Sequence, residues 1–297
     1  MIKKVLFSVI QDHEVIKNVV RKLEREEDIS LILHDPTKDF LDLENILKLL
    51  SDIDLLIVKV RNECSIDLLH IAKLYNIPTL HNVDTVLTCK NKIALDLAIR
   101  KLLIENPKLM EYFSIPRSWT QSLMNINKFK KWARPKLPIV IKSHYQHDKY
   151  NRFNFLIQKL EEVNQFCEKY KNFLYYDVYI QEFIESDGME YKIYVVGDKV
   201  YGIIRENPIY VFLREKPDYI DVNKLERNSF KIDEKVKNFA EKLSVSLDLK
   251  LFGFDLIKST IHNKWFIIDL NDFPSYKGIK TIEATISNFL KAYILNH

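Results

Sequence analysis

The first eighty residues alternate between short apolar runs and segments with helical spacing. Apolar runs at 4–10, 29–35, 53–60 and 77–82 have the composition of strands, and helix-like segments lie between them. This alternation is typical of β-α-β units, in which helices connect parallel strands. The sequence therefore predicts an α/β protein whose first domain, residues 1–83, is Rossmann-like in outline.

Glycine content limits how this chain can hold a phosphate group. The 297 residues include five glycines, and none of them forms a G-x-G-x-x-G or Walker motif. Those motifs need glycine because the backbone must turn tightly and approach the phosphates closely. A dinucleotide fingerprint and a Walker loop are therefore excluded, and a bound nucleotide must be held in another way.

Two further units follow the first domain. The unit at 84–174 is predicted to contain a helix from about Asp84 to Glu105, strands at 114–120 and 137–143, and a long helix from about Arg152 to Tyr170. The unit at 175–297 begins with a strand at 177–184 and a hairpin that turns at Gly197-Asp198, which are followed by a helix near 233–246, two strands and a closing helix.

Composition restricts the environment and the partners. The three cysteines are too few and too widely spaced for a disulfide framework or a CxxC metal site, which favours a reducing cytoplasm. The opening residues read as a first strand, and no apolar run approaches the roughly 18 residues of a membrane span. The net charge of +4 favours anionic ligands but gives no argument for nucleic acid. We expect a cytoplasmic monomer.

Two aspartates are predicted to face each other on a hairpin near the carboxyl end. If the turn centres on His262, Asp255 lies opposite Asp269, and Gly253 lies opposite Asn271. Directly opposed carboxylates repel, so a cation between them would stabilise the pair. Two carboxylates and an amide oxygen are ligands suited to Mg²⁺. The alternative is that one aspartate caps a loop or pairs with a nearby lysine.

The hairpin contains the sequences "LFGFDLI" and "IIDLNDFPSYKGI", and "YIQEFI" and "EYKIYVVGDK" precede them. Their order and spacing across residues 138 to 280 resemble the ATP-grasp superfamily and, within it, the inositol 1,3,4-trisphosphate 5/6-kinase (inositol-tetrakisphosphate 1-kinase) family. In that family "FGxD" precedes "IDxNxFPGYxG", and a hinge strand precedes "YKVFVVG". The resemblance implies an α/β ATP-grasp fold, in which two α+β sub-domains close on ATP behind the Rossmann-like domain.

The resemblance also implies roles for individual residues. It assigns the adenine hinge to Gln181, Glu182, Phe183 and Ile184, the Mg²⁺ ligands to Asp255, Asp269 and Asn271, and the contacts with ATP phosphates to Lys90, Lys142, Lys192 and Arg205. Of these, Lys142, Lys192 and Arg205 would act in catalysis, together with His147. Each basic residue has a simpler interpretation, because a lysine or arginine at a strand end often just faces water.

The acceptor site is implied by the same resemblance. In the family a histidine stands five residues after the strand lysine and a second stands ten residues after it; here these positions are His147 and Arg152. Substrate contacts are further assigned to Lys59, Ser275 and Lys277. The family's His-Gly-Thr reads His-Asp-Lys in this chain, and Ser275 replaces a glycine, so the loop is stiffer and its backbone approaches a phosphate less closely.

The implied activity is transfer of the γ-phosphate of ATP, with Mg²⁺, to a hydroxyl of an inositol polyphosphate. Several cations would suit so highly charged an acceptor. Two other functions remain open. One is a carboxylate-amine ligase resembling the ribosomal S6 glutamylating enzymes, which shares the ATP and metal residues but makes an acyl phosphate. The other is a regulatory module that binds nucleotide without turnover.

Overall fold

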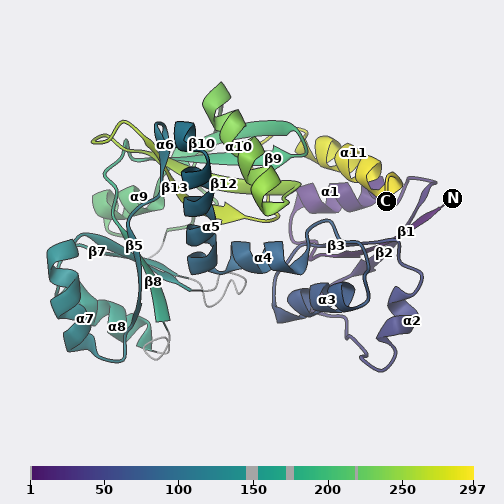
Figure 1. Ribbon diagram of the computed structural model, residues 1–297, viewed down its shortest axis with the longest axis horizontal. Helices are drawn as coiled ribbons and strands as arrows, with labels where there is room; N and C mark the ends of the chain where they lie inside the picture. The colour runs from purple at the N-terminus through teal and green to yellow at the C-terminus, as the bar shows by residue number, and fades with distance from the viewer. Residues whose placement is uncertain (1, 145–152, 172–176, 218–219) are drawn as a thin grey trace.

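The structure, a computed structural model, describes residues 2–144, 153–171, 177–217 and 220–297. Its amino-terminal part is a parallel sheet in the order β2-β1-β3. The strands are β1 (Lys3–Ser8), β2 (Ile29–His34) and β3 (Leu55–Val58), and the helices are α1 (Glu14–Leu23), α2 (Ile46–Leu50) and α3 (Glu63–Leu74). The fourth predicted strand contributes an isolated parallel bridge between Leu56 and Thr79. Figure 1 shows this part at the right of the molecule.

An antiparallel sheet in the order β5-β8-β6-β7 forms the second part. It contains β5 (Ser118–Ser122), β6 (Ile139–Ser143), β7 (Asn154–Ile157) and β8 (Asp177–Glu182), with helices α7 (Ile126–Ala133) and α8 (Glu162–Lys169) and the 3-10 helix η1 (Arg134–Lys136). The prediction of one helix from 152 to 170 is wrong. Its first part is β7, because the apolar run 153–157 pairs with β6 and buries Phe153 and Ile157.

The third part is a six-stranded sheet in the order β11-β10-β9-β12-β13-β4. Its strands are β4 (Phe113–Ser114), β9 (Met189–Val196), β10 (Lys199–Glu206), β11 (Asn228–Phe230), β12 (Leu251–Lys258) and β13 (Trp265–Asn271). The associated helices are α4 (Val83–Lys90), α5 (Lys92–Glu105), α6 (Pro107–Met110), α9 (Pro208–Glu215), α10 (Glu234–Leu247) and α11 (Ile282–Leu295). The hairpin turn at Gly197-Asp198 is confirmed by the pairing of Val196 with Lys199.

The sheets do not follow the chain in simple order. Strand β4 precedes the four-stranded sheet in sequence, yet it pairs in parallel with β13. The predicted helix at 84–105 is two helices, because Asn91 is extended and its side chain accepts hydrogen bonds from the Ile93 and Ala94 N–H groups. This cap places Lys92 in the first turn of α5. The boundaries at residues 83 and 174 stay a prediction.

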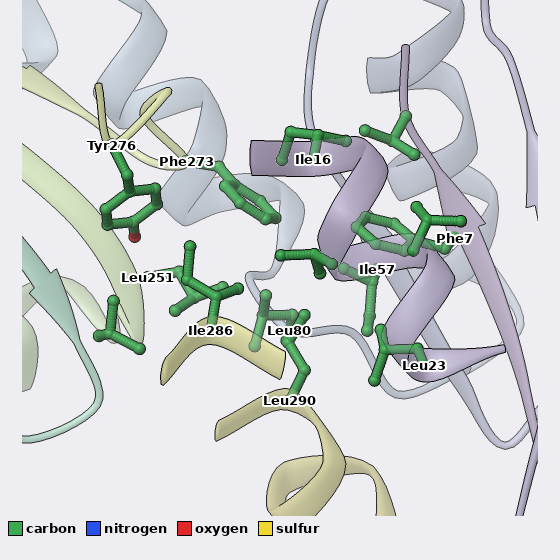
Figure 2. Close-up of a cluster of buried hydrophobic side chains, with 14 of the residues drawn as sticks. Phe7, Ile16, Leu23, Ile57, Leu80, Leu251, Phe273, Tyr276, Ile286 and Leu290 are labelled. Carbon is green, nitrogen blue, oxygen red and sulfur yellow. The ribbon is translucent and has the colours of Figure 1, made fainter. Parts of the chain in front are cut away.

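One hydrophobic core joins the first sheet to the third (Figure 2). Phe7 from β1 stacks on Phe273, which follows β13, with ring centroids 6.4 Å apart. Leu290 of α11 is fully buried in the same cluster, and the Tyr276 hydroxyl donates to the Val195 carbonyl over 2.9 Å. The loop after β13 is therefore fixed against both the first sheet and the third. No helix in the described ranges is long and apolar enough to cross a membrane.

Removing part of this core should destabilise both parts of the molecule. Leu290→Ala deletes three buried carbons and is expected to lower the free energy of unfolding by about 2–5 kcal/mol. Leu295→Ala, on the same helix at a side chain 39% exposed, is the matched control and should cost under about 1 kcal/mol. Urea unfolding followed by circular dichroism measures both. Equal losses in the two variants would contradict the shared core.

Candidate functional site

The carboxylate hairpin contains the two predicted residue pairs. Strand β12 pairs with β13 so that Asp255 lies opposite Asp269 and Gly253 lies opposite Asn271. An irregularity follows directly after Asp255, and nearer the turn Leu256 lies opposite Ile267, one residue out of the register that a turn centred on His262 gives. A side chain does not fit at position 253, because a Cβ there would lie 2.9 Å from the Ile193 carbonyl oxygen. Two carboxylates therefore share one face of the sheet, as the sequence predicted.

A row of alternating charge crosses this face of the sheet. On β9, Lys192 lies opposite Asp255, and its Nζ is 2.5 Å from the Asp255 Oδ2. Two residues along β9, Glu190 lies opposite Arg205 of β10 and forms an ion pair with it. Lys192 also lies 3.6 Å from Glu190. Each buried charge in the row thus has an opposite charge beside it, which buried ions require.

The second set of cations reaches the row from the other side. Lys142, on β6 of the four-stranded sheet, donates from its Nζ to the Ile268 carbonyl over 3.0 Å. Lys92, at the start of α5, forms an ion pair with Asp269, and its backbone N–H donates to the His144 carbonyl over 3.1 Å. The two lysines therefore connect the third sheet to the second, and both side chains are buried.

Lys90 was among the residues predicted to contact ATP, whereas Lys92 was not. Lys90, the last residue of α4, forms an ion pair with the buried Asp272 and lies beside the loop that follows β13. Lys92 contacts Asp269 itself. Asn91 could have indicated the position of Lys92. Asparagine commonly caps the start of a helix, so Asn91 predicts that a helix begins at Lys92.

Burial and neighbouring charge separate the two facing carboxylates. Burial raises the pKa of Asp255 to about 7, since the effect of Lys192 is opposed by Glu190 and Asp269. Burial also acts on Asp269, but Lys92 and Lys142 outweigh it and hold the pKa of Asp269 below its usual range. Burial and Lys92 lower the pKa of Lys142 to about 8, despite the nearby Asp269. This face carries perturbed groups of the kind found at functional sites.

The donor atoms fit Mg²⁺ under one condition. Within the described part of the chain, no three His, Cys, Asp or Glu side chains are grouped so as to hold a metal by themselves. Asp255 and Asp269 are instead paired with lysines. Both supply hard oxygen ligands, and Asn271 supplies an amide oxygen on the same face. A metal would fit here if the lysines moved from the carboxylates to a bound polyphosphate.

Lys59 is placed differently from a solvent-facing acceptor residue. Its side chain is buried, and its Nζ donates to the Phe273 carbonyl and, over 3.1 Å, to the Pro274 carbonyl. It also lies 4.7 Å from the centroid of the Phe273 ring. Burial, followed by the charges of Arg61 and Lys90, lowers the pKa of Lys59 to about 7. Lys59 thus holds the loop after β13 against the first sheet.

The predicted hinge continues from β8 and lies against both neighbouring segments. The Glu182 N–H donates to the Arg117 carbonyl over 2.9 Å, and the Phe183 N–H donates to the Pro138 carbonyl over 3.1 Å. The Gln181 amide nitrogen donates to the Tyr179 hydroxyl over 2.8 Å. An adenine would therefore have to use backbone groups other than these two N–H groups.

The remaining predicted acceptor residues are only partly placed. His147 and Arg152 lie outside the described residues. Lys277 donates to the Asn223 side-chain oxygen over 2.9 Å, and Ser275 is half-buried in the loop that Lys59 holds. Ser275 and Lys277 are thus carried by the segment that follows the metal-ligand candidates on β13.

Comparison with known proteins identifies related families. The family model described as "Inositol 1,3,4-trisphosphate 5/6-kinase ATP-grasp domain" matches residues 212–292. Inositol-tetrakisphosphate 1-kinase 1 of Arabidopsis thaliana is 26% identical over 167 residues, which are 45% of this chain and 52% of that protein. The match therefore spans about half the length of that curated relative. The alpha-aminoadipate–LysW ligase LysX of Saccharolobus solfataricus is 22% identical over 86% of this chain and 88% of that protein.

Solved structures are similar over the whole chain. D-alanyl-alanine synthetase A from Vibrio cholerae has a TM-score of 0.71 at 15% identity, with 99% of this chain and 98% of that chain covered. A RimK domain ATP-grasp protein from Sphaerobacter thermophilus has a TM-score of 0.69 at 13% identity, with coverage of 98% and 99%. The predicted fold class is confirmed, and the chain has the ATP-grasp fold. In sequence it resembles the inositol 1,3,4-trisphosphate 5/6-kinase family.

The burial of Lys59 predicts a pH dependence of stability. Its folded pKa of about 7 lies below the ordinary lysine value of 10.5, so between these values the unfolded chain holds a proton that the folded chain has released. The free energy of unfolding should therefore rise with pH across this window, by at most about 1.4 kcal/mol per pH unit. Lys59→Met should remove this rise.

Urea unfolding of the parent protein and of Lys59→Met, at several pH values between about 6 and 10, measures the effect. Lys101→Met is the control, because that side chain is 76% exposed. The advantage of the parent protein over Lys59→Met should grow with pH, while its difference from the control stays constant. If the difference in unfolding free energy between the parent protein and Lys59→Met also stays constant with pH, the buried position of Lys59 is contradicted.

Proposed function

We propose that this chain is an ATP- and Mg²⁺-dependent kinase that transfers the γ-phosphate to a hydroxyl of an inositol polyphosphate. The observation that carries the proposal is the pair of facing carboxylates, Asp255 and Asp269, each with its own lysine. Lys192 pairs with Asp255 and Lys92 pairs with Asp269, where the second sheet meets the third. The family model that matches residues 212–292 includes both aspartates and supports the same class.

The charges in the row suit a metal–nucleotide complex. Four basic residues (Lys92, Lys142, Lys192 and Arg205) surround three acidic ones (Glu190, Asp255 and Asp269), which gives a formal net charge of +1. A Mg²⁺ ion held here would supply positive charge close to the phosphates of ATP. Asp255, Asp269 and Asn271 would hold it. The lysines released from the carboxylates would then bind phosphate oxygens.

The two sets of cations would have separate tasks. Lys142 and Lys92 lie where the second sheet meets the third, so they would bind the phosphates that lead toward the hinge residues 181–184. Lys192 and Arg205 lie on the third sheet and would stabilise the transferred phosphoryl group. Positioning and electrostatics would supply most of the catalysis, since phosphoryl transfer needs little covalent help from the protein.

The acceptor would bind near the loop that follows β13. Ser275 and Lys277 belong to this loop, and His147 and Arg152 are the further candidates by resemblance. Lys59 would act by holding the loop in place through the Phe273 and Pro274 carbonyls, as well as by its charge. A monomer in the cytoplasm stays a prediction.

A carboxylate-amine ligase is the second candidate. It is favoured by the similarity to the alpha-aminoadipate–LysW ligase, which extends over 86% of this chain, whereas the similarity to inositol-tetrakisphosphate 1-kinase 1 extends over 45%. Both activities begin with transfer of a phosphoryl group to an oxygen atom, so the same metal and lysine residues serve both. The acceptor distinguishes them: a hydroxyl gives a phosphate ester, whereas a carboxylate gives an acyl phosphate that an amine then attacks.

The facing aspartates should be required for metal-dependent nucleotide binding. Asp255→Asn and Asp269→Asn each remove one anionic ligand, and each should reduce the Mg²⁺-dependent part of ATP affinity by at least about tenfold. Isothermal titration calorimetry with Mg²⁺ and with EDTA measures this difference. Asp198→Asn, in the β9–β10 turn, is the control and should bind as the parent protein does. Affinity indifferent to EDTA in the parent protein would reject the metal site.

The acceptor is tested by product analysis. The protein with MgATP should phosphorylate at least one member of a panel of inositol tris- and tetrakisphosphates, detected by anion-exchange chromatography. ADP release that depends on an amino acid or peptide carboxylate and an amine, without any inositol product, would instead support the ligase. ATP binding with no acceptor-dependent turnover in either panel would reject both and leave a nucleotide-binding module.

A further inference from the structure

An open groove lies between helix α5 and strand β5. Its volume is about 380 Å³, and the lining includes Leu97 and Arg100 from α5 and Arg117, Trp119 and Thr120 from the β5 segment. Figure 1 shows α5 and β5 running beside each other. Neither the metal candidates nor the hinge residues line this groove, so the proposed function does not account for it.

Strand β5 is the edge strand of its sheet among the described residues. It is the terminal strand of the order β5-β8-β6-β7, so no described strand pairs with its outer side. The Glu182 N–H donates to the Arg117 carbonyl, and β5 runs antiparallel to β8 with Ser118 opposite Gln181. Hydrogen-bonded pairs alternate in such a ladder, so the N–H and C=O groups of Ser118 and Thr120 point outward. An exposed edge of this kind is a template for another strand.

Helix α5 supplies an apolar wall beside that edge. Ile93 and Leu97 lie one turn apart on α5 and line the groove, and Leu97 is 61% exposed. Arg100 lies on the same stripe and is fixed, because its guanidinium donates to Asp96 and to the Pro116 carbonyl. Some peptide-binding domains add an extended peptide to an exposed strand edge. Backbone hydrogen bonds to the edge strand then give affinity, and contacts of the peptide side chains with the neighbouring surface give specificity.

The charges of the groove select the partner. Arg117 is exposed and lies 5.6 Å from the Trp119 ring, and Arg100 is 37% exposed. The acidic member of the lining, Asp96, is buried and accepts hydrogen bonds from Arg100, Ser118 and Tyr179. We propose that this groove binds an extended segment of a partner protein, with alternating apolar and acidic side chains, as an added strand on β5.

A display library of random ten-residue peptides, selected on the immobilised full-length chain, tests the proposal. Enriched peptides should alternate apolar and other residues and should carry Asp or Glu. Thr120→Pro removes only an outward N–H and keeps the bonds to β8, so it should weaken the best peptide about five- to tenfold in fluorescence anisotropy. Thr120→Val keeps that N–H and is the matched control, with affinity close to that of the parent protein.

Two further variants protect the test against a folding defect in Thr120→Pro. Leu97→Glu changes an exposed side chain and should weaken acidic peptides, and Arg117→Glu should shift the selection from acidic to basic peptides. Enrichment that is equal on the parent protein and on Leu97→Glu would overturn the proposal, as would peptides without acidic residues. So would sedimentation showing a dimer of the parent protein that Leu97→Glu dissociates, because a second copy would then occupy the edge.

Discussion

The arrangement of the site depends on two carboxylates that face each other across one strand pair. Asp255 and Asp269 are held together by the register of β12 and β13, and like charges so placed require a cation. Lys192 and Lys92 supply it in this structure, one from the same sheet and one from α5. A divalent metal would also supply the positive charge that these two carboxylates need. Metal–nucleotide binding could therefore replace the two lysines beside Asp255 and Asp269.

The sequence predicted the pairing of Asp255 with Asp269 but not the whole register of the hairpin. Next to the turn, Leu256 lies opposite Ile267, which is one residue out of the register that a turn centred on His262 gives, and the irregularity after Asp255 brings Asp255 opposite Asp269. The two-residue turn at Gly197-Asp198 was predictable from local turn residues. The ATP-grasp fold was implied by a resemblance whose motifs include these two hairpins.

Long-range contacts were not predictable in the same way. Lys59 is held by carbonyls of Phe273 and Pro274, more than 200 residues away, and nothing near Lys59 in the sequence indicates this burial. The strand β7 was mistaken for part of a helix because a short apolar run satisfies both patterns until its pairing partner is known. The ion pair between Lys92 and Asp269 likewise appears only when α5 meets β13.

A crystal structure of the protein with Mg²⁺ and a non-hydrolysable ATP analogue tests the metal site most directly. A metal ion should be bound by oxygens of both Asp255 and Asp269, with the Nζ atoms of Lys192 and Lys92 moved to phosphate oxygens. A bound nucleotide whose metal contacts neither aspartate, with both lysines still paired to the carboxylates, would contradict it.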